Sequence, residues 1–292
     1  MAKNYEAGQY GCPVGCKYCV VTEVDKRREQ WNESTVLGIN KAVTILNPPP
    51  DLDDKRAIDE FYNFPVELLR GDIVGFNGIS DPFWPKYRNE LDWFLKNVPN
   101  EAKLVTCVTK WNISDETMDK LAAVPNFRLV VSMTGLDQIE KTSTDQRLDV
   151  LWRAKEKGIK AFPIIHPYIP DMSDLSFLPK LKEMGYDEID IKGLRYNPDT
   201  MDAWMPKDVQ GHFARSRENE VLVDDGWSEL IALSGLQQIS LKHWYRQDFG
   251  ELTPHLSRDT AIELVGKIIA RANITSSDTD KAVIEAAIER RL

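Results

Sequence analysis

The sequence lacks three features that would direct the protein to a nucleic acid, a membrane or the secretory route. Acidic residues outnumber basic ones, 46 to 37, and the formal net charge is -9, which argues against general affinity for phosphate backbones. No apolar run approaches the roughly 20 residues that cross a bilayer. The first residues, Met1 to Tyr5, have no apolar stretch like that of a signal peptide. We therefore expect a cytoplasmic protein with no membrane partner.

Cysteine is also scarce, and its distribution is uneven. Of four cysteines, Cys12, Cys16 and Cys19 fall within eight residues, whereas Cys107 stands alone. A secreted domain that relied on disulfides would spread its cysteines along the chain, so clustered thiols indicate metal ligands or redox groups. Cys107 lies in the apolar run Leu104–Val108 and is predicted to be a buried residue of a strand.

Short apolar runs alternate with helical patterns in the first two thirds of the chain. Because the runs carry Val, Ile and Leu on both faces, they are typical of a parallel sheet covered by helices. This rhythm predicts an α/β fold with an open sheet or barrel. The predicted strands are 20–21, 72–77, 103–109, 128–133, 160–165 and 188–191, and the predicted helices are 87–97, 114–123, 145–157 and 175–184.

Two stretches depart from this rhythm. Residues 22–50 contain a charged run and end in Asn47–Pro50, which suits neither a helix nor an interior strand, so we predict a loop or insertion there. After residue 198 the pattern becomes polar and helix-like. We predict a barrel over residues 1–198 and a mostly helical C-terminal extension over 199–292 that covers it, with an amphipathic helix from Arg258 to Ala272.

The three clustered cysteines follow the pattern CxxxCxxC. Three thiolates on one loop can hold a cuboidal iron-sulfur cluster, whereas a ferredoxin normally supplies four cysteines for each cluster. One iron would then lack a protein ligand, and a small molecule could bind there, as at an open catalytic metal site. The alternative is a zinc loop completed by a distant residue such as His166 or His212.

The motif, with an aromatic residue, Tyr18, before its last cysteine, resembles that of the radical S-adenosylmethionine (radical SAM) superfamily. This resemblance covers roughly residues 5 to 197. It implies a partial parallel (β/α)6 barrel in which three cysteines hold a 4Fe-4S cluster and the open iron binds SAM. An electron from a flavodoxin or ferredoxin-type donor would cleave SAM to methionine and a 5'-deoxyadenosyl radical, which abstracts hydrogen from substrate.

A closer resemblance exists to the spore photoproduct lyase and DNA repair photolyase-like branch. It is carried by the order of four short motifs: Asn77–Phe83, Val108–Lys110, Val131–Thr134 and Pro167–Pro170. In the true spore lyases a cysteine that returns hydrogen to the product precedes the Ser-Asp pair. The matching position here is Gly78, so the resemblance suggests ancestry and not the DNA-repair reaction.

The resemblance assigns roles residue by residue. The loop after the second predicted strand, residues 72–77, would bind the SAM amino group. Its residues are Asn77, Gly78, Ser80 and Asp81. Lys110 would pair with the SAM carboxylate, and Ser132 would contact the ribose or the carboxylate. The expected cofactor-binding set is Tyr18, Asn77, Gly78, Ser80, Asp81, Lys110, Ser132 and His166, and the expected metal ligands are Cys12, Cys16 and Cys19.

Residues after the last two barrel strands are the expected substrate contacts, because strand ends surround the reaction centre of a barrel. Lys192 and Arg195 would orient the substrate, and Tyr168 or Tyr196 would relay a hydrogen atom. They could instead serve packing or pair with carboxylates of the extension. We expect these four residues to be catalytic.

The predicted function is therefore hydrogen abstraction from a small-molecule or peptide substrate. Only Cys107 remains outside the motif, so an auxiliary cluster is not expected, and the eleven residues before Cys12 hold no cobalamin domain. Two alternatives remain open. One is nucleic-acid modification or repair, for which Lys26–Arg28, Arg215 and Arg217 would be the basic footprint. The other is a non-catalytic iron-sulfur or zinc protein.

Overall fold

The computed structural model describes residues 12–19, 37–40, 43–49, 51–213, 220–223 and 225–249. The predicted strand at 20–21 and the predicted helix Arg258–Ala272 lie outside these residues. No helix in the described part of the chain has the length and apolar character needed to cross a bilayer.

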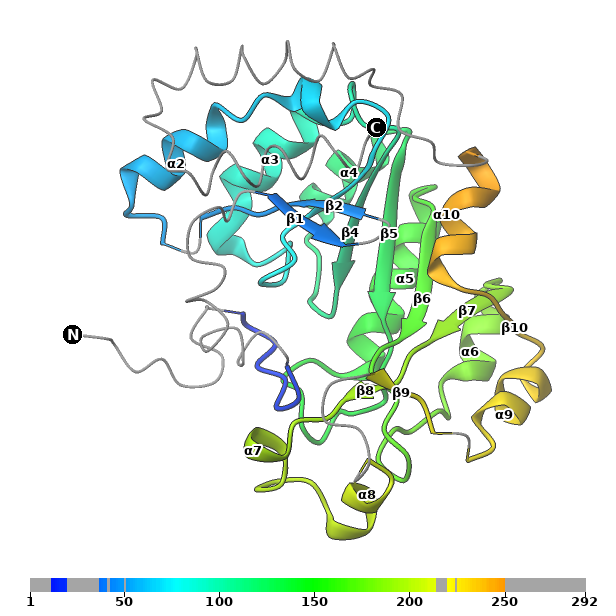
Figure 1. Cartoon of the computed structure of the whole chain (residues 1–292). Helices are drawn as coiled ribbons and strands as arrows, with labels where there is room; N and C mark the ends of the chain where they lie inside the picture. Colours follow the sequence, from blue (N-terminus) through cyan, green and yellow to red (C-terminus); the bar gives the residue numbers. More distant parts are fainter. Residues whose placement is uncertain are drawn as a thin grey trace.

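One mostly parallel sheet organises the structure (Figure 1). Its strands follow the order β1-β2-β3-β4-β5-β6-β7-β10, in which β1 and β2 pair antiparallel and all later neighbours pair parallel. Helices connect most of the parallel strands, so the predicted α/β class and open sheet are confirmed. The strands are β1 Leu37–Asn40, β2 Val43–Leu46, β3 Ile73–Phe76, β4 Leu104–Thr109, β5 Phe127–Ser132, β6 Ala161–Ile165, β7 Glu188–Ile191 and β10 Gln237–Gln238.

The connecting helices agree with their sequence signals. Ser114 caps α4 by accepting a hydrogen bond from the Thr117 amide, and Ser143 and Gln146 form a capping box at the start of α5. Gly158, at φ 72°, follows the end of α5 as predicted. The helices of this part are α2 Lys55–Tyr62, α3 Arg88–Asn97, α4 Asp115–Ala122, α5 Thr144–Glu156 and α6 Leu178–Glu183, with 3-10 turns at Val66–Leu69 and Pro85–Tyr87.

The prediction of a loop over residues 22–50 is wrong for its last part, since β1 and β2 lie there. Residues 43–46 form a short apolar strand that adds to the sheet beside β3. The prolines on which the loop prediction rested begin only at Pro48, after β2 has ended. They therefore remove no hydrogen bond from the pairing of β2 with its neighbours.

Residues after 193 build both a small satellite and a new sheet strand. β8 Leu194–Arg195 pairs antiparallel with β9 Glu220–Val221, and the short helices α7 Pro198–Met201 and α8 Lys207–Gly211 lie between them. The chain then passes through α9 Trp227–Leu233, adds β10 beside β7, and ends its described part in α10 Leu241–Phe249. The C-terminal part therefore contributes to the main sheet as well as covering it.

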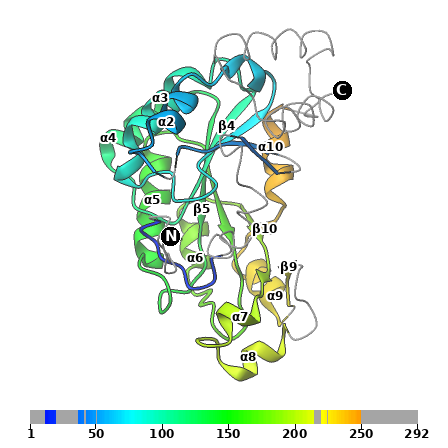
Figure 2. The ribbon, with the colours of Figure 1, turned by 60° about the vertical axis from the view of Figure 1, so that its left-hand side comes forward.

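The two faces of the sheet are covered differently. Helices α3, α4 and α5 lie on one side of β4 and β5, and α10 lies on the other (Figure 2). We call the side that carries α10 the inner face. There Trp244 stacks on Phe162 with ring centroids 4.8 Å apart, and the Tyr245 hydroxyl lies 2.9 Å from Thr106 Oγ1. Tyr245 also joins a cluster with strand residues Ile73, Leu104, Val130 and Ile164.

The buried hydroxyl pair between α10 and β4 yields a stability prediction. Tyr245→Phe leaves the Thr106 hydroxyl without its buried partner, so we expect the free energy of unfolding to fall by about 1 kcal/mol. Urea denaturation measures this change. Lys242→Ala, on the exposed side of the same helix, is the control and should change stability by less than about 0.5 kcal/mol. Equal effects of the two substitutions would contradict the role of the hydroxyl pair.

Candidate functional site

Strand register places most of the predicted site residues on the inner face. Partners across a parallel sheet point to the same side, and side chains alternate along each strand. Thr106 pairs with Gly75, and Asn77 stands two residues beyond Gly75. Ser132 pairs with Ile164, and Ile164 pairs with Asp190. These three residues therefore lie on one face of the sheet. His166 and Lys192 stand two residues beyond Ile164 and Asp190, just after the ends of β6 and β7.

The upper part of this face, toward the carboxyl ends of the strands, is exposed at Val108 and buried at Asn77 and Ser132. Val108 of β4 is 48% exposed although it lies in the middle of the sheet, whereas its register partner Val130 is fully buried. The sidechains of α10 cover the lower part, around Leu104 and Thr106. An exposed apolar side chain in a central strand, surrounded by polar strand ends, is the kind of surface on which a ligand packs. Sequence analysis assigned no role to Val108.

The cysteine loop, residues 12–19, is shaped by its own turns and by its neighbours. Gly15 adopts φ 57°, a left-handed conformation that glycine tolerates, and the Cys19 amide donates to the Cys16 carbonyl at 3.1 Å. The Lys141 amide donates to the Val14 carbonyl at 3.1 Å, which ties the loop to the segment between β5 and α5. All three motif cysteines are half-buried and are not in disulfides.

Burial and nearby charges act in opposite directions on these thiols. Burial raises the pKa of Cys12, while amide groups of Val14 and Asp81 act to lower it. Burial also raises the pKa of Cys16 strongly, and the nearby Lys110 ammonium opposes this shift. Among the residues that the structure describes, no three Cys, His, Asp or Glu side chains stand close enough together to hold a metal ion. Cysteine loops commonly gather their sulfurs only on binding metal.

Lys110 is the cation of this site. Burial lowers its pKa, and the nearby Cys16 and Cys19 sulfurs and the Asp81 carboxylate act to raise it. Its Nζ lies 5.8 Å from the centroid of the Tyr18 ring, a cation–π contact. Within the described part of the chain, Nζ has no hydrogen-bond or ion-pair acceptor. The structure thus brings Lys110 next to the cysteine loop.

The loop after β3 is held in an unusual conformation by side chains. Asn77 adopts φ 57°, and its Oδ1 accepts hydrogen bonds from the amides of Ser80 at 2.8 Å and Ile79 at 3.3 Å. The Gly78 amide donates to Asn47 Oδ1 at 2.8 Å, a second asparagine that sequence analysis did not single out. Asn77 Nδ2 and Ser80 Oγ are buried and have no hydrogen-bond partner among the residues that the structure describes. Such orphaned groups are what a bound ligand would satisfy.

Asp81 is committed to holding the same loop. Thr109 Oγ1 lies 2.9 and 2.8 Å from its two oxygens, and the amides of Lys110 and Phe83 donate to it at 2.9 and 3.0 Å. Burial raises the pKa of Asp81, and these donors act to lower it. The carboxylate therefore links the ends of β3 and β4 and positions the Lys110 backbone.

Two other predicted cofactor residues lie side by side. The Ser132 hydroxyl donates to the His166 carbonyl at 2.9 Å, so it joins the ends of β5 and β6. His166 Nε2 lies 3.8 Å from a Glu220 oxygen. Tyr18 is buried, and its hydroxyl has no partner within the described part of the chain, which makes it a further orphaned group near the cysteines.

The four residues predicted to be catalytic are divided between two places. Lys192 Nζ lies 3.9 Å from Asp190 at the end of β7, and Arg195 of β8 is exposed and pairs in register with Glu220. Tyr168 donates its hydroxyl to Asp225, at 2.6 Å from each oxygen. His166 experiences the charges of Lys110, Lys192 and Arg195, so these cations share its surroundings.

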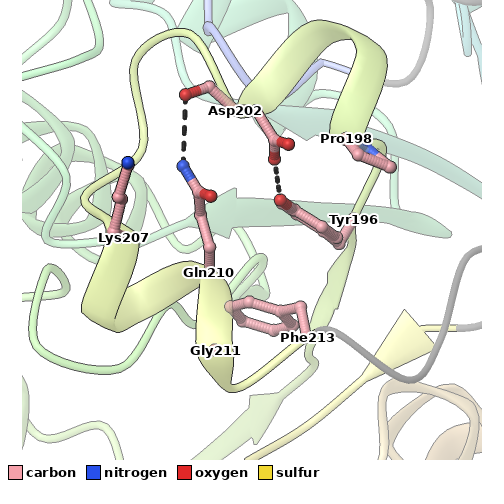
Figure 3. Close-up of a pocket in the computed structure, with 7 residues that line it drawn as sticks. All are labelled: Tyr196, Pro198, Asp202, Lys207, Gln210, Gly211 and Phe213. Carbon is pink, nitrogen blue, oxygen red and sulfur yellow. Dashed lines mark hydrogen bonds between the residues drawn. The ribbon is translucent and has the colours of Figure 1, made fainter.

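Tyr196, the fourth, lies in the satellite. Its hydroxyl donates to Asp202, and its ring stacks on Phe213 with centroids 5.5 Å apart. Both rings line a cavity of about 380 Å³ together with Asp202, Lys207 and Gln210 (Figure 3). The satellite's apolar core is continuous with the cysteine loop, because it contains Tyr18 and packs against Cys16.

Comparisons with known proteins give distant similarities. No family model matches the sequence. Over 188 residues the chain is 26% identical to the uncharacterized protein MJ0683 of Methanocaldococcus jannaschii, which covers 60% of this chain and 64% of the relative. The chain thus spans slightly less than two thirds of the length of that curated relative.

The similar solved structures are also remote. SuiB of Streptococcus suis superposes with a TM-score of 0.41 at 11% identity, over 65% of this chain and 45% of that one. SuiB bound to S-adenosylmethionine superposes with a TM-score of 0.36 at 16% identity, over 50% of this chain and 36% of that one. Spore photoproduct lyase complexed with dinucleoside spore photoproduct gives 0.42 at 13% identity, over 80% and 70%. The fold class rests on the strand order of this chain.

The cations around His166 yield a pH prediction. Partial burial of the ring, whose side chain is 45% exposed, followed by the charges of Lys110, Lys192 and Arg195, lowers the pKa of His166 to about 3 from the ordinary 6.5, against the Glu220 carboxylate 3.8 Å from Nε2. A lowered histidine pKa stabilises the folded state above pH 6.5, and this contribution is lost as the pH falls toward 3. We expect the C2 proton resonance of His166 not to titrate between about pH 5 and 8.

Lys192→Met tests the origin of the shift, since removing a neighbouring cation should raise the pKa of His166. The same resonance reports the change. Lys207→Met, which removes a lysine of the satellite cavity that is not among the charges acting on His166, is the control. A wild-type resonance that titrates near the ordinary histidine pKa would show that the cations do not surround the imidazole.

Proposed function

We propose that the protein is a radical SAM enzyme that abstracts hydrogen from a small-molecule or peptide substrate. The observation that carries this proposal is the placement of the CxxxCxxC loop beside Lys110, a half-buried cation without an acceptor among the described residues, at the carboxyl ends of β3 and β4. Carboxyl ends of parallel strands are where α/β proteins bind ligands.

The donor set suits a 4Fe-4S cluster better than zinc. Three cysteines on one loop leave a cluster with one iron free to bind a small molecule, whereas structural zinc needs a fourth protein ligand. The histidines considered as that ligand contact carboxylates instead: His166 faces Glu220 at 3.8 Å, and His212 faces Asp171 at 3.5 Å. Burial raises the pKa of Cys12, and amides of Val14 and Asp81 only partly oppose this shift, so the metal itself must favour the thiolate form that binds it.

SAM is the small molecule that the neighbouring side chains fit. Lys110 would pair with its carboxylate, and the orphaned Asn77 Nδ2 and Ser80 Oγ offer polar groups for the rest of the methionyl part. Gly78 leaves the backbone of this loop accessible, and Asp81 holds the loop in place. When bound, the cluster would supply the electron that cleaves SAM and yields the hydrogen-abstracting 5'-deoxyadenosyl radical.

The substrate would lie on the part of the inner face around Val108. Val108 offers an apolar surface there, and His166, Lys192 and Arg195 stand on the strand ends around it. Ser132 would act on SAM or substrate mainly by holding the His166 backbone. Tyr168 and Tyr196 remain the candidates for hydrogen-atom relay, and each already donates to a carboxylate that can accept the phenolic proton. The electron donor would be a flavodoxin or ferredoxin, in keeping with a cytoplasmic protein.

Anaerobic reconstitution with iron and sulfide, followed by dithionite and SAM, tests the proposal. We expect about four irons per chain and release of 5'-deoxyadenosine, measured by chromatography. Cys12→Ser, Cys16→Ser and Cys19→Ser should each prevent both, because each removes one of the three cluster ligands. Cys107→Ser is the matched control and should retain the cluster, since Cys107 is a buried residue of β4.

Three other outcomes would decide against the proposal or for an alternative. Stoichiometric zinc with no cluster would favour the zinc-binding alternative. A full cluster without SAM binding would favour a non-catalytic iron-sulfur protein. Deuterium transfer into 5'-deoxyadenosine from a labelled oligonucleotide, and not from small metabolites or peptides, would favour the nucleic-acid alternative.

Lys110→Ala tests the SAM carboxylate contact in the loaded protein. Loss of a charge-assisted hydrogen bond should weaken SAM binding by about 1.5 to 3 kcal/mol, or roughly 10- to 150-fold in the dissociation constant. Isothermal titration under anaerobic conditions measures the constant. Lys207→Ala, in the satellite cavity, is the control and should leave it unchanged. An unchanged dissociation constant in Lys110→Ala would remove this role from Lys110.

A further inference from the structure

A buried ion pair lies directly behind the cysteine loop. Arg147 of α5 pairs with Glu140, and their side chains are 1% and 0% exposed. The other oxygen of the carboxylate, Oε1, lies 3.9 Å from Cys16 Sγ and accepts from the thiol. A single carboxylate therefore contacts both a buried arginine and the middle cysteine of the motif.

Side chains and backbone groups of the segment between β5 and α5 form hydrogen bonds with most polar atoms of the Glu140 and Arg147 side chains. Thr134 Oγ1 donates to Glu140 Oε2 at 2.7 Å, and Arg147 Nη1 lies 2.8 Å from the same hydroxyl. Arg147 Nη2 donates to the Thr142 carbonyl at 2.8 Å. Desolvating two charges is costly, and apolar replacements often leave stability unchanged or increased, so stability alone does not account for the pair.

The segment that carries the pair also forms the wall against which the cysteine loop rests. Lys141, next to Glu140, donates its amide to the Val14 carbonyl at 3.1 Å. A Cβ at Gly15 would lie only 3.0 Å from Lys141 Cε, so the cysteine loop and the segment around Lys141 are in close contact. Leu136 packs in one cluster with Tyr18. Backbone, side-chain and apolar contacts thus all join residues 134–147 to the cysteine loop.

We propose that Glu140 and Arg147 are a positioning pair for the metal centre, which holds Cys16 against the end of β5 and keeps the cluster's reduction potential low. The second part follows from charge, because a carboxylate beside a ligating sulfur disfavours an added electron. Burial raises the pKa of Glu140 to about 7, and Arg147 opposes this shift and fixes the carboxylate in place. Lys110, which acts on the same sulfur with the opposite sign, limits the effect. This inference rests on the proposed function, since it requires the cluster.

Glu140→Gln is the first test, made on the anaerobically reconstituted protein. Gln keeps the length of the side chain and an acceptor for Thr134 and Arg147, removes the charge, and presents an amide NH2 to Cys16 in place of Oε1. We expect iron and sulfide content to stay at the wild-type level. The midpoint potential should become less negative, and the electron paramagnetic resonance spectrum of the reduced cluster should change. Asp145→Asn, an exposed carboxylate on α5, is the matched control and should leave both unchanged.

The double variant Glu140→Met with Arg147→Met tests the holding role without leaving an unpaired buried charge. In the metal-free protein we expect the thermal midpoint to stay within a few degrees of wild type. Amide hydrogen exchange of residues 12–19 should become several-fold faster, and the reconstituted variant should lose iron faster to a chelator. Because exchange is measured without metal, it decides the holding role even if Glu140→Gln fails to fold.

The outcomes separate the two proposals. Wild-type protein that takes up no cluster overturns the proposed function. Wild-type protein that loads fully, with Glu140→Gln at the same potential as Asp145→Asn, overturns the influence of Glu140 on the cluster. Unchanged exchange and iron retention in the double variant overturn the holding role and leave the pair with a purely structural one.

Discussion

The parallel register of β3 to β7 is the constraint on which the candidate site depends. Because paired residues of a parallel sheet point the same way, residues separated by 26 to 55 positions in sequence reach one face at one edge. Asn77, Ser132, His166 and Lys192 meet in this manner. A shift of one residue in any pairing would turn the corresponding strand's contribution to the helix-covered face, where apolar packing leaves no room for it.

Helix α10 gives this face its depth. Its aromatic residues fill the amino-terminal half of the inner face, where Tyr245 reaches Thr106 and Trp244 stacks on Phe162. In the carboxyl-terminal half, Val108 is left exposed. A segment late in the chain therefore forms the floor of a site whose walls come from the preceding strands, and the Asp190 carboxylate, which accepts from the Leu241 amide at 2.9 Å, joins the two.

Charges of alternating sign surround the cysteine loop. Lys110 lies on the side of the strand ends, and Glu140 with Arg147 lies on the side of α5. Lys110 is half-buried and the Glu140–Arg147 pair is fully buried, so both act on the sulfurs through a medium that screens poorly. Lys110 favours thiolates, and Glu140 opposes them. A site built in this way can hold negatively charged sulfurs and still keep the added electron of a bound cluster energetically costly.

The sequence alone determined the alternation of strands and helices, the helix ends at Ser114 and Gly158, and the cysteine pattern, because periodicity, capping and spacing are local properties. It singled out Lys110 as a contact of the SAM carboxylate only through a resemblance, and the position of Lys110 beside the cysteines came from the structure. It missed β2, whose strand of four residues is too short to stand out beside the prolines that follow. No local pattern marked Glu140, Arg147 or Val108. Charged residues near a helix start and valines in a strand are common, and most of them have no functional role. Only the tertiary structure decided that two of these charges are buried behind Cys16 and that Val108 is exposed, because burial depends on which distant segments cover a position.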